Sequence, residues 1–163
     1  MLQAAEAQLR EVGSLSLDTA ARAADVSKAG LMYHFGTKED LMGAVVDRIM
    51  DRYQAELTEL LPGEGDLATA TVRERLAAYV IWSCEAELDV SDLVMFTDPR
   101  LREPLTQRWT ERFEPWLAVP TDLPSREQSR LLSARLLADG VWFAGASGTL
   151  PLTASQRDRK SVV

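Results

Sequence analysis

A short stretch of the sequence, residues 26–41, gathers side chains that could bind an anion. It reads VSKAGLMYHFGTKEDL and contains two lysines, a tyrosine and the chain's only histidine. No acidic residue occurs from Val26 to Lys38, although the whole chain carries a formal net charge of -7. Cationic side chains without neighbouring carboxylates suit the phosphates of a nucleic acid. Lys28, His34 and Lys38 are therefore the first candidates for a binding surface.

The composition argues against several other kinds of chemistry. One histidine and one cysteine cannot build a typical zinc cluster. The single cysteine, Cys84, allows no intrachain disulfide. No GxSxG, GxGxxG or P-loop pattern occurs. A helical hydrolase or lyase that uses His34 or Cys84 is disfavoured because these residues lie in different segments. We expect no enzyme activity, no cofactor and no metal.

The sequence also bears on localisation. No apolar run approaches the roughly 20 residues that a membrane-spanning helix needs. The N-terminal segment MLQAAEAQLREVG is amphipathic and contains acidic residues, so it does not resemble a signal peptide. With a single cysteine and no export signal, the sequence predicts a cytoplasmic protein without a membrane partner.

The anion-binding candidates lie on two short helices that a tight turn connects. Ser16 can cap a helix that stops near Asp25, and Ser27 can cap the next helix, KAGLMYHF. This arrangement is typical of a helix-turn-helix, whose second helix fits the major groove of DNA. Gly13 is expected to end the preceding helix and Thr37 to cap the following one. The residues expected in the core of this motif are Ala21, Val26, Leu31 and Phe35.

The remainder of the chain predicts further helices and no strand, so the expected fold class is all-α. An apolar residue recurs every four positions along one helix, at Leu41, Val45, Ile49, Tyr53, Leu57 and Leu61. That helix breaks at residues 62–66, PGEGD. Three later segments, around residues 68–88, 98–115 and 125–148, also have helical patterns. Pro115, Pro120 and Pro124 are expected to end the second of them.

The segment SLDTAARAADVSKAGLMYHFGTKEDL resembles the DNA-binding signature of the TetR (tetracycline-repressor-like) family, and the match extends over about residues 2–46. The resemblance implies a helix-turn-helix DNA-binding domain at residues 1–46 and a helical ligand-binding and dimerisation domain at residues 47–163. Asp25 stands where the family usually has a turn glycine, and aspartate can adopt the left-handed conformation required there. The chain is expected to begin inside the first helix, after the basic arm that often precedes it.

The family pattern assigns roles to individual residues. Lys28 and Gly30 occupy positions that face bases. Ser16 and Thr19 lie near phosphate in the preceding helix, and Tyr33 and His34 match an aromatic pair that commonly contacts phosphate. Lys38 begins the fourth helix, where the helix dipole also favours an anion. The expected DNA-binding residues are thus Ser16, Thr19, Lys28, Gly30, Tyr33, His34 and Lys38.

The later helices offer two further sites, each with a purely structural alternative. Aromatic and polar residues could line a pocket for a small apolar ligand, or could simply form a packed core; they are Tyr79, Trp82, Ser83, Phe96, Trp109 and Phe113. One helix could form a symmetric dimer interface or pack within the chain, through Leu132, Leu136, Gly140 and Ala144.

The sequence as a whole predicts a homodimeric transcription regulator that binds a palindromic operator in double-stranded DNA. We expect a repressor that a small apolar ligand releases from the DNA. The alternative is a helical dimeric interaction module without DNA binding, which the net charge and the absent basic arm favour. Binding to DNA at moderate salt separates the two hypotheses.

Overall fold

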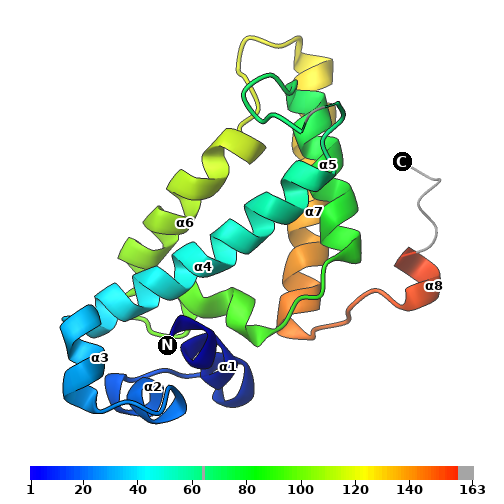
Figure 1. Ribbon diagram of the computed structural model, residues 1–163. Coiled ribbons are helices and arrows are strands. Elements are labelled where there is room, and N and C mark those ends of the chain that lie inside the picture. The colour runs from blue at the N-terminus through cyan, green and yellow to red at the C-terminus, as the bar shows by residue number, and fades with distance from the viewer. Residues whose placement is uncertain (64, 158–163) are drawn as a thin grey trace. The chain divides into compact units, whose positions relative to one another are not determined.

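The structure, a computed structural model, describes residues 1–63 and 65–157. These ranges contain eight α-helices, one 3-10 helix and no strand, which confirms the all-α fold class (Figure 1). The elements are α1 Leu2–Val12, α2 Leu17–Ala23, α3 Lys28–His34, α4 Lys38–Glu59, α5 Val72–Glu85, η1 Val90–Phe96, α6 Arg102–Leu117, α7 Ser125–Ser147 and α8 Ala154–Arg157.

The chain forms two compact units that each combine two stretches of sequence. The first contains Met1–Arg52 and Asp89–Arg112, and the second contains the described residues of Tyr53–Leu88 and Phe113–Val163. Helices α4 and α6 therefore contribute residues to both units. The functional division at residue 46 that the sequence predicts stays a prediction.

Local hydrogen bonds define the helix ends of the first unit as the sequence predicts. Gly13 ends α1 with a φ of 71°, and its N–H donates to the Leu9 carbonyl at 2.7 Å. Ser16 begins α2 with a reciprocal capping box, in which its Oγ accepts from the Thr19 N–H and Thr19 Oγ1 accepts from the Ser16 N–H. Ser27 begins α3 by accepting from the Gly30 N–H at 3.0 Å.

The turn between α2 and α3 depends on Asp25. Its φ is 53°, so the backbone adopts the left-handed conformation expected there. The N–H of the next residue, Val26, donates to the Ala21 carbonyl at 3.0 Å and closes the turn.

The core of the first unit confirms most of the apolar predictions for the helix-turn-helix. Helix α1 packs against α2 and η1, and α2 packs against α3. Ala21 and Leu31 are buried, and Phe35 is half-buried. The prediction for Val26 was wrong, because its side chain is 37% exposed. Val26 lies in the turn between two helices, where no helix face carries it into the core.

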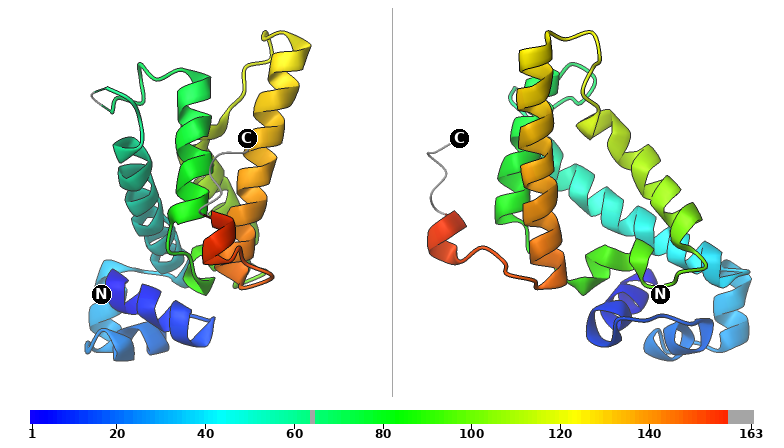
Figure 2. Two further views of the ribbon diagram at one scale, coloured as in Figure 1. Left: turned by 90° about the vertical axis from the view of Figure 1, so that its right-hand side faces the viewer. Right: turned by 180° about the vertical axis from the view of Figure 1, so that it is seen from behind.

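The second unit is built on α5 and α7, which lie side by side (Figure 2). Tyr79 of α5 stacks on Trp82 with ring centroids 5.8 Å apart, and Phe113 meets Tyr79 edge-on at the same distance. Tyr53 lies 4.3 Å from Trp82 between ring centroids. Such tilted and edge-on pairs contribute stability beyond the burial of their surface.

Helix α6 contains a proline, Pro115, in its last turn. Pro115 was predicted to end its helix, but α6 continues to Leu117 with Pro115 inside it. A proline removes only its own N–H donor, and the Ala118 N–H still donates to the Glu114 carbonyl at 2.9 Å.

In the part of the chain that the structure describes, every helix is too short or too polar to cross a membrane.

Candidate nucleic-acid interface

Helix α3 presents most of its side chains to solvent. Leu31 is its buried residue, at 1% exposure, and anchors the helix in the first unit. Lys28 and His34 are exposed, and Tyr33 is 87% exposed. The rings of Tyr33 and His34 meet edge-on with centroids 5.3 Å apart. Three of the predicted DNA-binding residues therefore lie on one short helix and are accessible to a partner.

Ser16 and Thr19 are half-buried and occupied by the capping box of α2. Their hydroxyl oxygens lie 3.1 Å apart, and the Thr19 hydroxyl also donates to the Ser16 carbonyl at 3.1 Å. Both side chains thus define the start of α2 in the free protein. A phosphate contact from either residue would have to share a hydroxyl that already takes part in these bonds.

Gly30 keeps the first turn of α3 open. A Cβ at this position would lie 3.2 Å from the Ser27 Oγ, which caps the helix. The Gly30 N–H is also the donor to that oxygen. A side chain at this position would press on the cap, which gives Gly30 a structural role beside any contact with a base.

Both lysines of the interface form ion pairs. Lys28 Nζ donates to Asp18 Oδ2 at 3.0 Å, and the two side chains are 53% and 60% exposed. Lys38 Nζ donates to Asp98 Oδ2 at 2.6 Å, and these side chains are 37% and 19% exposed. The second pair is shorter and less accessible to water, so solvent screens it less.

The Asp98 carboxylate is held at both of its oxygens. Lys38 donates to Oδ2, and the Arg100 backbone N–H donates to Oδ1 at 3.0 Å. The hydrogen bond from Lys38, followed by the one from Arg100, lowers the pKa of Asp98 below its usual value. Asp98 is therefore a charged and well-fixed partner for Lys38 at neutral pH.

The start of α4, next to Lys38, has its own capping box. The Asp40 N–H donates to Thr37 Oγ1 at 3.1 Å, and Asp40 Oδ2 accepts from the Thr37 N–H at 2.9 Å. This confirms Thr37 as the cap that the sequence predicts. The side chain of Lys38 is not part of this cap.

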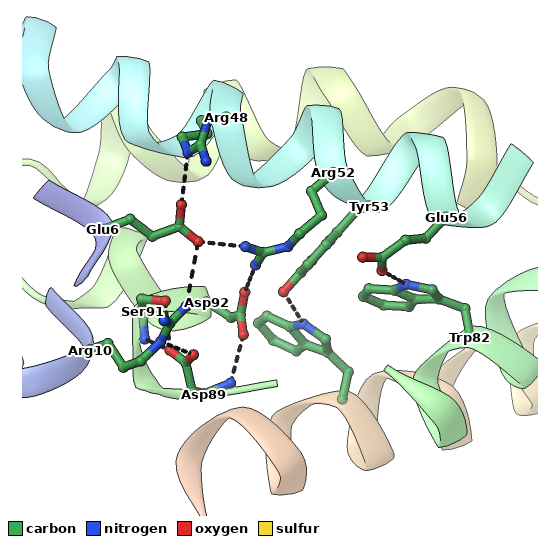
Figure 3. A network of polar contacts seen from close by, with 11 residues as sticks. Glu6, Arg10, Arg48, Arg52, Tyr53, Glu56, Trp82, Asp89, Ser91 and Asp92 are labelled. Atoms are coloured by element: carbon green, nitrogen blue, oxygen red, sulfur yellow. Dashed lines mark hydrogen bonds and ion pairs between the residues drawn. The ribbon is translucent and has the colours of Figure 1, made fainter. Parts of the chain in front are cut away.

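Ion pairs connect α1 with α4 and η1 in a network of charged residues that the sequence did not reveal (Figure 3). Glu6 of α1 is only 4% exposed, and its carboxylate accepts from Arg48 at 3.0 Å and from Arg52 at 2.5 Å. Arg52 also donates to Asp92 of η1 at 2.7 Å, and Asp92 is fully buried. One signal was available, because Glu6 lies four residues after Leu2 on the apolar face of α1.

The network continues through Asp89, the residue that caps η1. Asp89 accepts from the hydroxyl and N–H of Ser91 and pairs with Arg10 of α1. Burial alone would raise the pKa of Asp89, but the hydrogen bonds from Ser91 and Arg10 together lower it below its usual value. Helix α1 is therefore tied by ion pairs to both α4 and η1.

Two arginines of α6 pair with aspartates of α4 within the first unit. Arg108 donates to both oxygens of Asp47, at 2.8 and 2.6 Å, and Arg112 donates to Asp51 at 2.5 Å. The two hydrogen bonds to Asp47 raise the pKa of Arg108. Bidentate pairs of this kind fix orientation as well as distance.

The six residues predicted to line a ligand pocket are divided between the two units. Tyr79, Trp82, Ser83 and Phe113 belong to the second unit, and Phe96 and Trp109 belong to the first. Tyr79 and Trp82 are buried, whereas Phe96 is 48% exposed and Trp109 is half-buried. The pocket stays a prediction.

The polar atoms of the two buried aromatics are already bonded. The Tyr79 hydroxyl donates to Asp139 at 2.8 Å, and Trp82 Nε1 donates to Glu56 at 2.6 Å. A cavity of about 350 Å³ lies beside Ser83, and Cys84, Leu88 and Gly145 are among its other lining residues. In the described ranges, no three His, Cys, Asp or Glu side chains gather in a way that could hold a metal ion.

Helix α7 exposes apolar side chains along one side. Leu132 and Leu136 are 37% and 61% exposed. A Cβ added to Gly140 would meet no atom within 4 Å, and Ala144 is half-buried. Two further large apolar residues of this helix, Leu137 and Phe143, are also exposed. The residues predicted for a dimer interface therefore lie at an accessible surface of the monomer.

Comparison with known proteins identifies the N-terminal domain. Residues 1–45 match the family model described as bacterial regulatory proteins, tetR family. No curated protein matches the sequence. The matched residues contain α1, α2, α3 and the start of α4, which hold the exposed candidate residues described above. The N-terminal part of the chain is therefore similar to the helix-turn-helix domain of tetR family regulators, which supports a DNA-binding transcription regulator.

Proposed function

We propose that this chain is a sequence-specific repressor in the cytoplasm, which binds a palindromic operator as a homodimer and is released by a small apolar ligand. The observation that supports DNA recognition best is the exposed surface of α3. It presents Lys28, Tyr33 and His34 in a segment without carboxylates, inside the matched helix-turn-helix.

On this proposal, α3 enters the major groove, which is wide enough for one helix. Lys28 and the backbone at Gly30 approach base edges. Tyr33, His34 and Lys38 contact phosphates, which position the helix without carrying sequence information. Ser16 and Thr19 add phosphate contacts through the start of α2.

The exposed apolar residues of α7 support a symmetric dimer. Leu132 and Leu136 would be covered by the same helix of a second chain, and Gly140 and Ala144 would let the two helices approach closely. Two recognition helices related by a twofold axis would read half-sites about one helical turn of DNA apart, or a multiple of it.

Release by a ligand requires two states with different affinities for it. The candidate pocket residues are mainly aromatic, which suits an apolar molecule with few polar groups. Helix α4 begins with Lys38 at the DNA and contributes its last residues to the second unit. It is therefore the element through which a ligand would change the spacing of the recognition helices.

Selection of bound duplexes from a random DNA pool tests this proposal. The matched control is the variant with Lys28→Ala, Tyr33→Ala and His34→Ala, three exposed positions whose change should leave the fold intact. Recovery of a palindrome by the wild type but not by the control supports the regulator and gives the half-site spacing. Recovery of no sequence by a folded dimer would favour the interaction module without DNA binding.

A further inference from the structure

The ion pair between Lys38 and Asp98 has a consequence for DNA affinity, and it rests on the proposed function. We infer that Asp98 competes with a DNA phosphate for Lys38 and thereby limits the affinity of the protein for DNA. In the DNA-free protein the ammonium group lies 2.6 Å from the Asp98 carboxylate. Asp98 is thus an affinity-determining residue outside the helix-turn-helix.

The geometry shows which partner has to move. Asp98 is 19% exposed and accepts a second hydrogen bond, from the Arg100 backbone N–H at 3.0 Å. The side chain of Lys38 is 37% exposed, and its ammonium group lies at the end of four flexible methylene groups. The carboxylate is therefore the fixed member of the pair, and Lys38 has to turn away from it to reach a phosphate.

The competition follows from the charges. A lysine that neutralises a phosphate releases a condensed counterion, which is a main source of DNA affinity. A lysine that already neutralises a carboxylate contributes less to the free energy of DNA binding, because its attraction to the phosphate is offset by the loss of the ion pair. A carboxylate left close to the phosphate also repels it.

The other lysine ion pair of the interface, between Lys28 and Asp18, competes less with a DNA phosphate. Lys28 and Asp18 are 53% and 60% exposed, and their atoms are 3.0 Å apart. Water and salt screen such an exposed pair, so it contributes little. The effect is accordingly assigned to Asp98.

The effect should not depend on the DNA sequence. Lys38 is proposed to contact phosphate, and such contacts are made with every duplex. Removing the charge of Asp98 should therefore tighten binding to the operator and to unrelated DNA by the same factor. It should also make the binding more sensitive to salt, because one more lysine takes part fully.

The test is the variant Asp98→Asn in the full chain, with DNA binding measured by fluorescence anisotropy at several salt concentrations. The amide oxygen can still accept from the Arg100 N–H, so the local fold should be kept. We expect binding at low salt to become about fivefold tighter for both operator and scrambled duplexes. The slope of log affinity against log salt should become steeper by up to about one unit.

A double-variant experiment shows whether Asp98 acts through Lys38. The gain in DNA affinity from Asp98→Asn should disappear when Lys38 is replaced by Met, because there is then no lysine for which Asp98 and the phosphate compete. Glu39→Gln is the matched control. It also removes one negative charge, at an exposed acid next to Lys38. It should change binding by clearly less than Asp98→Asn does.

Three results would overturn the inference while the wild type still binds its operator. They are unchanged or weaker binding by Asp98→Asn with an unchanged melting temperature, the same gain in the Lys38→Met background, and an equal gain from Glu39→Gln. If the folded wild type binds no duplex at any salt concentration, the proposed function itself fails. The two failures are therefore distinguishable.

Discussion

Arg52 of α4 donates a hydrogen bond at 2.7 Å to Asp92 of η1, whose side chain is fully buried. The same guanidinium donates to Glu6 of α1, so one arginine connects three elements of the first unit. An unpaired charge at these buried carboxylates would be costly, and three arginines near Glu6 offset that cost. Helix α1 is therefore attached to α4 and η1 by ion pairs.

Glu6→Gln should destabilise the protein by about 1–3 kcal/mol, because Arg48 and Arg52 lose a charged acceptor that is shielded from water. The free energy of unfolding in urea measures this loss. Glu11→Gln, an exposed change on the same helix, should have little effect. Equal losses in both variants would show that the buried network contributes nothing specific.

Lys28→Ala and Lys38→Ala should weaken DNA binding in different ways. Loss of Lys28 should reduce the preference for the operator, because this side chain is proposed to face bases. Loss of Lys38 should weaken all duplexes alike and lower the salt slope by up to about one. Equal loss on operator and random DNA in the Lys28 variant, or an unchanged slope in the Lys38 variant, would contradict these roles.

Gly140→Leu should produce a folded monomer. A side chain at Gly140 meets no atom within 4 Å in the chain, so the fold should tolerate it, while a partner helix would be pushed away. Gly145→Leu is the contrasting variant, because a Cβ there would lie 3.1 Å from Leu88. It should lower the stability of the chain by about 1–3 kcal/mol. Sedimentation and thermal unfolding measure both effects, and a dimeric Gly140→Leu at low micromolar concentration would move the interface elsewhere.

Asp25→Gly should stabilise the protein by up to about 1 kcal/mol, because glycine adopts a positive φ without the steric cost that a side chain brings. The opposite change, Gly13→Ala, places a side chain at a φ of 71° and should destabilise it by about 1 kcal/mol. A Cβ at Gly13 meets no atom within 4 Å, so the effect is one of backbone conformation. Melting temperatures that shift in the same direction in both variants would contradict this explanation.

Stability should fall at alkaline pH because of Tyr79. Burial raises the pKa of its hydroxyl well above the usual value, and the negative charge of Asp139, which accepts its hydrogen bond, raises it further. Because the pKa of Tyr79 is raised in the folded state, its protonated hydroxyl contributes fully to the free energy of unfolding below about pH 10. This contribution is lost as the pH rises above it, by up to about 1.4 kcal/mol per pH unit.

Tyr79→Phe should flatten this alkaline decline, because the phenylalanine has no proton to lose. Urea unfolding between about pH 8 and 11 measures the slope. Tyr33→Phe is the control, since Tyr33 is 87% exposed and should leave the slope unchanged. A wild-type slope in the Tyr79 variant would assign the alkaline decline to other groups.

The sequence by itself determined the local structure of the helix-turn-helix. Ser16, Ser27 and Thr37 cap helices through bonds to residues three positions away, and such bonds depend only on neighbouring residues. The apolar spacing along α4 likewise follows from helical geometry, and the six residues of that stripe, from Leu41 to Leu61, are all buried. Lys28 and His34 were found from their charge and their place on one short helix, whereas the role of Tyr33 came from the family resemblance.

The tertiary structure alone decided which distant residues meet. Lys38 and Asp98 are 60 residues apart in the sequence, and Glu6 and Arg48 are 42 apart. The pairing of such charges depends on how separate elements pack, and no local spacing encodes it. The exposure of Phe96 and Val26 was decided in the same way, because burial of an apolar side chain depends on the elements that cover it.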